Sequence, residues 1–422
     1  MRAPPYLLSN SNQKAASLQH YPATRAHGLQ LLQAFQPRMG SRYAAGRNYD
    51  YGRDGHKHVS GLSPYIRHRL ISESEVTAAA LTGHGHAAAE RFIAEVFWRG
   101  YFKGWLEHRP TIWADYVAGV QTDLAILDKD RRQRRDVQSA MAGGTGIGCF
   151  DEWATELVET GYLHNHARMW FASIWIFTLG LPWRLGADFF YRHLTDGDPA
   201  SNTLGWRWVA GLHTRGKAYA AQGWNVAKFT GGRHVPREDD FVFPVVAQQD
   251  LEPDGLPGLQ PLRHPPAPRG DLPTALLITA EDCNLANFDT ANLDLVAAAT
   301  LQCSHLRSPL EVADHVTAFE SAALHDAAQP FAANFTEMTA GLPTDLAKWA
   351  TRAGARQIAT PFVPQGPVRD WLDTARPGLD AAGISLCEWQ SDWDRAIWPS
   401  ATAGFMKVEK QIPAILRELG MT

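Results

Sequence analysis

Cysteine is scarce in this chain, which has four cysteines among its 422 residues. Cys149, Cys283, Cys303 and Cys387 lie far apart, and no two of them form a CxxC pair. Zinc sites and iron–sulfur clusters need closely spaced thiolates, and small secreted scaffolds need many disulfides, so the spacing argues against all three. The scarcity fits a reducing compartment, and we expect a cytoplasmic protein without a metal site.

Long apolar runs are missing as well. The longest, MWFASIWIFTLGLPW, lies between Arg168 and Arg184 and has fifteen residues. A helix that spans a bilayer needs about 20 apolar residues, so this run predicts a buried core helix. The first residues lack the pattern of a signal peptide. We therefore expect no membrane partner.

Tryptophan and charge, by contrast, are distributed unusually. The chain has 15 tryptophans, which favours either a large core or a stacking or redox function. Residues 1–237 hold 28 Lys and Arg against 19 Asp and Glu, whereas the remainder holds 12 against 25. A basic half joined to an acidic half indicates that the first half contacts an anionic partner, although chance alone can also produce such an imbalance.

Three regions follow one another along the chain. Residues 1–235 have apolar residues at three- and four-residue spacing, which predicts an all-helical domain. Nine prolines between Pro236 and Pro273 predict an extended linker over 236–273. Residues 274–422 then alternate short apolar runs with helical patterns, which predicts an α/β domain with a parallel sheet. Its expected strands are 275–279, 301–306, 356–360 and 384–389.

A short loop and two helical faces carry the most informative polar residues. In HVSGLSPYIRHRLIS, hydroxyl groups and a glycine precede a predicted helix. This pattern indicates either a phosphate-binding site or an N-cap of the helix. Glu95, Trp98 and Arg99 share one helical face, as do Asn165 and Met169 on a later helix. These groups suit either the wall of a pocket for a flat ligand or a structural ion pair beside core residues.

Five segments together resemble the flavin-binding helical domain of the photolyase/cryptochrome family. They occur in the family's order and at about its spacing, over residues 25–235. The DGD…N…GWxW pattern of Asp196–Trp208 is the most specific of them. The five segments are HVSGLSPYI, FIAEVFWRGYF, TGYLHNHARMWFAS, PWRLGADFFYRHLTDGDPASNTLGWRW and GKAYAAQGWNVAKFT.

The resemblance implies a noncovalently bound FAD and a set of residues around it. Asp196 would pair with Arg168 beside the isoalloxazine ring, Asp198 would bond its polar edge, and Asn202 would face N5. The remaining cofactor-binding residues would be Ser60, Gly61, Leu62, Ser63 and Arg99. Trp206 would be the indole nearest to the ring and Trp183 the next electron donor. The outermost donor stays open, with Trp153, Trp170 and Trp175 as candidates by residue type alone.

The resemblance also implies a substrate. Glu95, Trp98, Asn165, Met169 and Trp208 match the positions that line the lesion pocket of cyclobutane pyrimidine dimer photolyases. We therefore expect a light-driven lyase, active under blue light, that repairs DNA containing pyrimidine dimers as a monomer. The alternative is a cryptochrome-like photoreceptor with the same flavin and tryptophans. A third hypothesis is a flavin-binding scaffold without a light function.

Several departures from the family pattern bear on these expectations. Gly100 stands where the family has a glutamate, His166 where many members have arginine, and Tyr162 where tryptophan is common. The family normally begins with an α/β antenna domain, whereas the α/β pattern here follows the flavin domain. We expect an antenna-like domain moved to the C-terminal side, and its pigment stays unknown.

Overall fold

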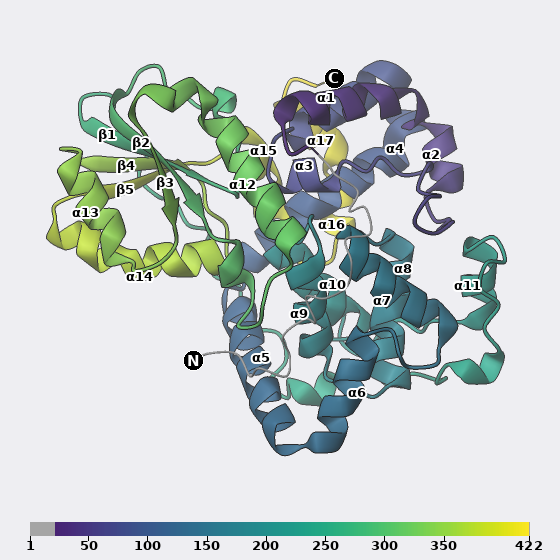
Figure 1. Ribbon diagram of the computed structural model, residues 1–422. Coiled ribbons are helices and arrows are strands. Elements are labelled where there is room, and N and C mark those ends of the chain that lie inside the picture. Colours follow the sequence, from purple (N-terminus) through teal and green to yellow (C-terminus); the bar gives the residue numbers. More distant parts are fainter. Residues whose placement is uncertain (1–21, 422) are drawn as a thin grey trace.

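The computed structural model describes residues 22–421, so residues 1–21 of the predicted first domain lie outside the described residues. Two bodies lie side by side, a parallel sheet with its helices and a larger helical region (Figure 1). The helical region contains α1 (Arg25–Phe35), α2 (Ser41–Gly46), α3 (Ser63–Arg67), α4 (Glu73–Glu107), α5 (Thr111–Lys129), α6 (Arg131–Met141), α7 (Gly148–Thr160), α8 (Asn165–Ser173), α9 (Trp183–His193), α10 (Pro199–Val209) and α11 (Gly223–Phe229).

Helix α4 is the longest element and the centre of the helical region. Ser72 caps its N-terminus in a capping box with Glu75, so two free N–H groups at the helix start are satisfied. The helix changes direction at Gly85, whose φ of 70° only glycine adopts easily. Beyond this kink, α10 packs against α4 and against α8. Helix α10 therefore contacts both α4 and α8.

The apolar run that we expected to form a core helix is helical and buried. It occupies α8 and a π-helical turn, Ile174–Thr178, that ends before Pro182. Trp170 and Trp175 within it are fully buried. None of the helices among residues 22–421 has the length and apolar content that crossing a bilayer requires.

The second body is a five-stranded parallel sheet, as the alternating pattern predicts, with strand order β3-β2-β1-β4-β5. Alternate residues of β1 point to opposite faces, because Leu276 and Ile278 join one apolar cluster and Leu277 joins another. Helix α12 covers the first face, and α13 and α14 cover the second. The elements are β1 (Pro273–Thr279), β2 (Asp294–Gln302), α12 (Asp314–Ala328), β3 (Phe335–Thr339), α13 (Thr344–Arg352), β4 (Gln357–Pro361), α14 (Pro367–Ala381) and β5 (Ser385–Trp389).

Two strands differ from the sequence prediction. The second strand ends at Gln302, so the expected strand over 301–306 was wrong beyond that residue, and Ser304–Arg307 form a 3₁₀ turn. Strand β3 was not predicted, because it lies at the edge of the sheet and several of its side chains are exposed. An exposed edge strand lacks the apolar run that marked its neighbours.

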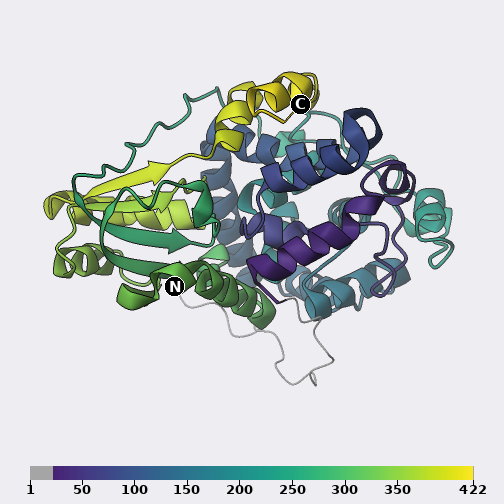
Figure 2. The same cartoon turned by 90° about the horizontal axis from the view of Figure 1, so that it is seen from above.

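The last part of the chain returns to the helical region. Helices α15 (Asp392–Ile397), α16 (Met406–Glu409) and α17 (Ile412–Glu418) lie over α4 rather than over the sheet (Figure 2). We call residues 392–421 the C-terminal segment. The chain thus leaves the helical region through the proline-rich linker, forms the sheet, and comes back to cover α4.

Candidate active site

Two buried aspartates precede helix α10, and the first is paired within the helical region. Arg168 Nη2 lies 2.8 Å from Asp196 Oδ2. Burial alone would raise the pKa of Asp196, but Arg168 holds it below its usual value, with help from Ser63 and Arg99. Asp196 is therefore a carboxylate, and the ion pair that the resemblance implies is present between α8 and the start of α10.

The second aspartate is surrounded by cations from two other helices. Asp198 Oδ1 caps α10 by accepting a hydrogen bond from the Ser201 N–H. Its Oδ2 lies 3.5 Å from Lys103 Nζ, 3.8 Å from Arg67 and 4.0 Å from Arg99. Burial would raise the pKa of Asp198, but Lys103, Arg99 and Arg67 lower it well below its usual range. This carboxylate stays charged in the core.

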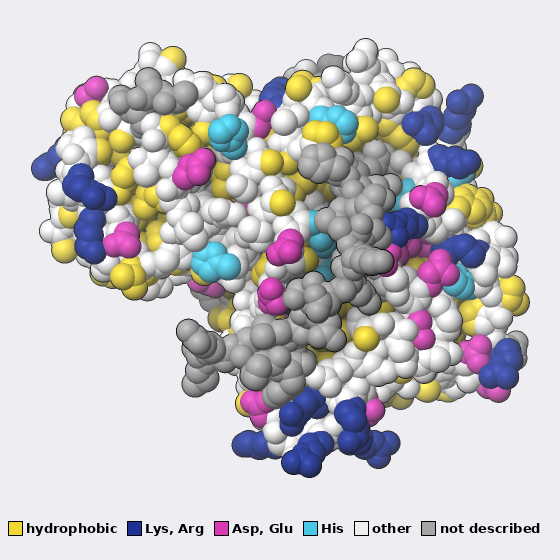
Figure 3. All heavy atoms as spheres, viewed as in Figure 1, with side chains coloured by type: hydrophobic (Ala, Val, Ile, Leu, Met, Phe, Trp, Pro, Cys, Tyr) yellow, Lys and Arg dark blue, Asp and Glu magenta, His cyan; other side chains and the backbone are white. Residues whose placement is uncertain are grey.

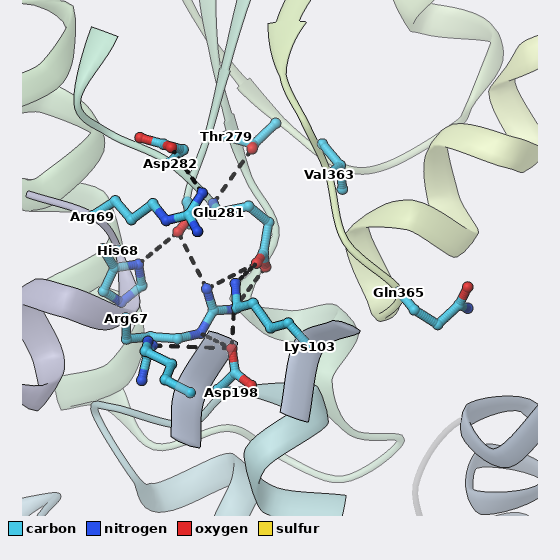
Figure 4. A network of polar contacts seen from close by, with 12 residues as sticks. Arg67, His68, Arg69, Lys103, Asp198, Thr279, Glu281, Asp282, Val363 and Gln365 are labelled. Carbon is cyan, nitrogen blue, oxygen red and sulfur yellow. Dashed lines mark hydrogen bonds and ion pairs between the residues drawn. The ribbon is translucent and has the colours of Figure 1, made fainter. Parts of the chain in front are cut away.

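The cations beside Asp198 also contact the α/β domain. Arg67 makes two hydrogen bonds with Glu281, which follows β1, at 2.9 and 2.7 Å. Lys103 Nζ lies 3.7 Å from Glu281. Figure 4 shows Arg67 and Lys103 between Asp198 on one side and Glu281 on the other. The carboxyl end of β1 thus reaches the candidate site.

The site has unused hydrogen-bonding capacity, which fits a polar ligand such as FAD. Among the described residues, Asp198 Oδ2 and the Nε and Nη2 atoms of Arg99 are buried without a hydrogen-bond partner. Such groups cost about 1–3 kcal/mol each when they stay unsatisfied. The isoalloxazine edge offers both donors and acceptors, so these residues fit the cofactor that the resemblance implies.

The loop before α3 and the amide of Asn202 have defined local geometry. Gly61 has a φ of 65°, and the Ser60 hydroxyl accepts a hydrogen bond from the Leu62 N–H at 3.3 Å. Leu62 is fully buried, and Ser63 is the first residue of α3. The Asn202 Nδ2 donates to the Ala187 carbonyl at 2.8 Å. This bond fixes the orientation of the amide between α9 and α10.

Trp206 lies in an aromatic cluster. Its ring centroid is 5.1 Å from that of Phe190, 6.4 Å from Phe171 and 6.2 Å from Trp175. It also packs on α9, because a Cβ placed at Gly186 would come within 2.3 Å of the indole. Trp183 begins α9, one turn from Gly186.

The tryptophans left open as outermost donors occupy two different places. Trp175 lies inside the cluster around Trp206. Trp153 and Trp170 stack on each other with centroids 5.4 Å apart, and His166 stacks on Trp170 at 4.1 Å.

The residues expected to line a lesion pocket come from three packed helices but differ in their surroundings. Glu95 is partly exposed and forms an ion pair with Arg47. Asn165 is exposed at the start of α8, and Met169 is half-buried one turn later. Trp208 is half-buried beside Tyr219, with centroids 5.4 Å apart.

Trp98 contacts the C-terminal segment. Its indole and the Phe405 ring stack with centroids 4.0 Å apart and an angle of 14°. One face of this half-buried indole is therefore covered by the chain itself.

The structure gives a physical reason for Gly100. A Cβ at this position would lie 3.1 Å from Ile397 Cδ1 and 3.2 Å from Trp393 Nε1. A glutamate here would meet the C-terminal segment, so glycine allows that segment to pack on α4.

Tyr162, another departure from the family pattern, lies beneath the Arg168 guanidinium, whose carbon is 5.6 Å from the ring centroid.

Comparison with known proteins identifies the helical region. Residues 92–243 match the family model of the FAD binding domain of DNA photolyase. This segment holds Asp196, Asp198, Arg168 and the tryptophans described above. The helical region of this chain belongs to the photolyase/cryptochrome family. It is an FAD-binding domain.

Relatives in the photolyase/cryptochrome family match only part of the chain. The deoxyribodipyrimidine photo-lyase of Streptomyces griseus is 34% identical over 167 residues, which are 38% of this chain and 35% of the relative. That of Escherichia coli is 29% identical over 230 residues, which are 51% and 45% of the two chains. This chain thus spans less than half the length of either relative.

Solved structures of the family are similar over a comparable share. A bacterial class III photolyase from Agrobacterium tumefaciens shares 26% identity and a TM-score of 0.40 over 49% of this chain and 43% of its own. A cryptochrome from Synechocystis shares 22% identity and a TM-score of 0.42 over the same shares.

Arg67, Lys103 and Glu281 were not among the predicted site residues. Lys103 follows Arg99 by four residues, so a shared helical face was readable in WRGYFKGW. Glu281 follows a predicted buried strand, at the end where parallel sheets place functional residues. Arg67 has no such signal, because its partner Glu281 lies 214 positions away.

Proposed function

We propose that this protein repairs cyclobutane pyrimidine dimers in DNA by light-driven electron transfer from FAD. The observation that carries the proposal is the buried pair of Arg168 and Asp196 next to Asp198, whose Oδ2 lies 4.0 Å from Arg99. Among the described residues, neither this oxygen nor the Nε and Nη2 of Arg99 has a hydrogen-bond partner. This arrangement offers donors and acceptors side by side in a water-poor core, which suits the polar edge of a flavin ring. The names of the similar photo-lyases support the same reaction class.

FAD held at this site would, when reduced and photoexcited, supply the electron that opens the cyclobutane ring and would accept it back. The residues around it bind and orient. Asp198 would accept a hydrogen bond from the ring edge, and Arg99 would donate one. Asn202 presents an amide that Ala187 holds in one orientation. The buried aromatic residues around Trp206 would exclude water from the ring.

The lesion would lie where α4, α8 and α10 face one another. A flipped-out dimer needs stacking surfaces and hydrogen bonds to its base edges, since leaving the duplex costs a few kcal/mol. Trp98 and Trp208 would supply the stacking surfaces and Glu95 the hydrogen bond. Met169 would form the floor of the pocket, and Asn165 would lie between the lesion and the ring.

Positive charge on the helical region supports an anionic partner. Dark blue side chains gather at the lower edge of the molecule, over α6 (Figure 3). Lys129, Arg131, Arg132 and Arg135 are all exposed there. Contacts of this kind bind phosphates without reading sequence, and their strength falls with salt.

One observation favours the photoreceptor as the second candidate. Phe405 already covers one face of Trp98, so one stacking surface is occupied by the chain itself. A photoreceptor needs the flavin and its electron donors but no open lesion pocket. Under the repair proposal, Trp98 offers its other face to the lesion.

The test compares damaged with undamaged DNA. Purified protein is loaded with FAD, reduced chemically, mixed with an oligonucleotide containing one thymine dimer, and illuminated with blue light. We expect the dimer to disappear only in the light. A protein that binds FAD but neither prefers damaged DNA nor restores the thymines supports the photoreceptor instead.

Trp98→Ala sharpens this test. Base–aromatic stacking contributes about 1–3 kcal/mol per base, so the affinity for dimer-containing DNA should fall by roughly tenfold to a hundredfold. Affinity for undamaged DNA and FAD content should change little, and Trp98→Phe should recover much of the loss. Equal loss for both kinds of DNA would contradict the assignment of Trp98 to the lesion pocket.

A further inference from the structure

Aromatic residues of α5 connect Trp183 to the boundary between the two bodies. The Tyr116 ring lies 6.0 Å from that of Trp183, and the Trp113 ring lies 5.4 Å from that of Tyr116. All three side chains are at most 3% exposed. The three rings form a continuous series of oxidisable groups. Trp113 and Tyr116 lie one turn apart on α5, and Tyr116 faces Trp183 at the start of α9.

The inner end of this series of rings, Trp183, is connected to the surroundings of the proposed flavin site. Trp206 meets Trp175 edge to face at 6.2 Å. The Trp175 Nε1 donates to the Pro182 carbonyl at 2.9 Å, and Pro182 directly precedes Trp183. Direct contacts therefore link Trp206 through Trp175 to the residue before Trp183. Tyr116 and Trp113 of α5 extend this series of contacts beyond Trp183.

Trp113, at the outer end of the series, has a carboxylate partner that the inner indoles lack. Trp113 Nε1 donates to Asp370 Oδ2 at 2.7 Å, and Asp370 is an exposed residue of α14. The Nε1 atoms of Trp183 and Trp206 are buried without a partner among the described residues. A carboxylate beside an indole stabilises positive charge on it. The oxidised, positively charged form of the indole is therefore more stable at Trp113 than at Trp183.

Tyr116 has a nearby group that can take its proton. Its hydroxyl is buried without a hydrogen-bond partner among the described residues. Helices α5 and α9 pack against each other, and Asp188 lies on α9 five residues after Trp183, whose ring contacts Tyr116. Burial raises the pKa of Tyr116, and the charge of Asp188 raises it further. Burial raises the pKa of Asp188 to about 6, although Arg192 opposes the rise. At neutral pH Asp188 is mostly ionised. Its Oδ2 lies 3.5 Å from Arg192 Nε and has no hydrogen-bond partner among the described residues.

We propose that Tyr116 and Trp113 form the outer part of the electron route, with Trp113 as the outermost donor; this rests on the proposed function of Trp183. One electron passes from Tyr116 to the oxidised Trp183, and the phenolic proton passes to Asp188. One electron then passes from Trp113 to the Tyr116 radical, which takes its proton back from Asp188. The net result is a neutral Trp183 and an oxidised Trp113 beside the Asp370 carboxylate.

The experiment measures flavin photoreduction in FAD-loaded protein with an external thiol reductant. Tyr116→Phe and Trp113→Phe should each slow it by about tenfold, which corresponds to a barrier higher by about 1.4 kcal/mol. Transient absorption should show a neutral tyrosyl radical that accumulates in Trp113→Phe and is absent from Tyr116→Phe. Repair after chemical reduction should be unchanged in both variants, so a failure of this inference and a failure of repair are distinguishable.

Two controls separate this role from a structural one. Tyr191→Phe removes another buried hydroxyl without a partner, and its ring contacts Trp113 but does not lie between Trp113 and Trp183. It should photoreduce like the wild type. Apoprotein carrying Tyr116→Phe should unfold at the same temperature as the wild type or higher, because an unsatisfied polar group is removed.

Three results overturn the proposal. One is a wild-type rate of photoreduction in Tyr116→Phe or in Trp113→Phe. Another is an unchanged rate in Trp183→Phe, which places the route elsewhere. The third is wild-type protein that binds FAD and is not photoreduced.

Discussion

Two sets of residues on helix α4 make contacts that differ in kind. Arg99 and Lys103 lie one turn apart and face the charged groups around Asp198 and Glu281. Gly100 and Gly104 also lie one turn apart and face the C-terminal segment. Adjacent residues of a helix point about 100° apart, so two neighbouring stripes of one helix serve the two contacts.

The difference between the stripes shows how one helix combines binding with assembly. The charged stripe brings partners for a buried carboxylate, and it leaves some of their hydrogen-bonding capacity free for a ligand. The glycine stripe has no polar group to offer and instead lets Trp398 approach the backbone closely. Changes in the charged stripe should therefore alter both cofactor binding and stability, whereas changes in the glycine stripe should alter mainly stability.

The largest effect is expected for Arg67→Met. This change leaves Glu281 buried without its hydrogen-bonded partner and removes a cation from Asp198. Breaking a buried pair in this way lowers the free energy of unfolding by about 3–5 kcal/mol. Denaturant unfolding of the full chain measures it. The double variant Arg67→Met, Glu281→Leu should recover part of the loss, and no recovery would show that the pair does not hold the two bodies together.

Gly104→Ala comes next. Its Cβ would lie 2.7 Å from Trp398 Cδ1 and 2.9 Å from the Trp398 Cα, and backbone cannot move as cheaply as a side-chain end. Overpacking of this kind costs about 1–3 kcal/mol, which exceeds the gain in helix propensity. Thermal unfolding checks the loss, with FAD affinity measured alongside. A variant as stable as the wild type would contradict the close packing of the C-terminal segment on α4.

The two stripes also show what the sequence can and cannot predict. The DGD segment and its neighbours could be recognised because the resemblance rests on residues close together in sequence. The parallel sheet could be predicted from alternating apolar runs. The contacts of α4 were not readable, although WRGYFKGW places Arg99 with Lys103 and Gly100 with Gly104. The partners, Glu281 and Trp398, lie some 180 to 300 positions further on, and no local pattern encodes such distances. The same holds for Tyr116, whose neighbour Trp183 is on another helix.

The contribution of the charged stripe to stability should depend on pH in the acid range, whereas that of the glycine stripe should not. The folded-state pKa of Asp198 lies below the ordinary value of 3.8, because Lys103, Arg99 and Arg67 outweigh the effect of burial. A lowered pKa means that Asp198 contributes stability above pH 3.8 and loses it as the pH falls through the folded-state pKa. One such group changes the free energy of unfolding by at most about 1.4 kcal/mol per pH unit.

Asp198→Asn should therefore be less stable than the wild type at neutral pH but should lose less stability on acidification. Denaturant unfolding measured across the acid range gives both slopes. Gly104→Ala serves as the matched control, since it removes no titrating group and should keep the wild-type slope. Parallel slopes in the wild type and Asp198→Asn would mean that another group dominates the acid transition.

The smallest effect is expected for Gly100→Ala. Its Cβ would approach Ile397 Cδ1 at 3.1 Å and Trp393 Nε1 at 3.2 Å, and both atoms are ends of side chains that can shift by a few tenths of an ångström. Alanine also gains about 0.5–1 kcal/mol over glycine within a helix, which offsets much of that strain. We expect the unfolding temperature to stay close to that of the wild type, well above that of Gly104→Ala. Gly100→Glu, which restores the family's residue type, should instead detach the C-terminal segment, since its longer side chain has no room beside Trp393. Limited proteolysis of the segment distinguishes the two variants. If Gly100→Glu is as protected as the wild type, the C-terminal segment does not need glycine at this position, and the departure from the family pattern has another cause.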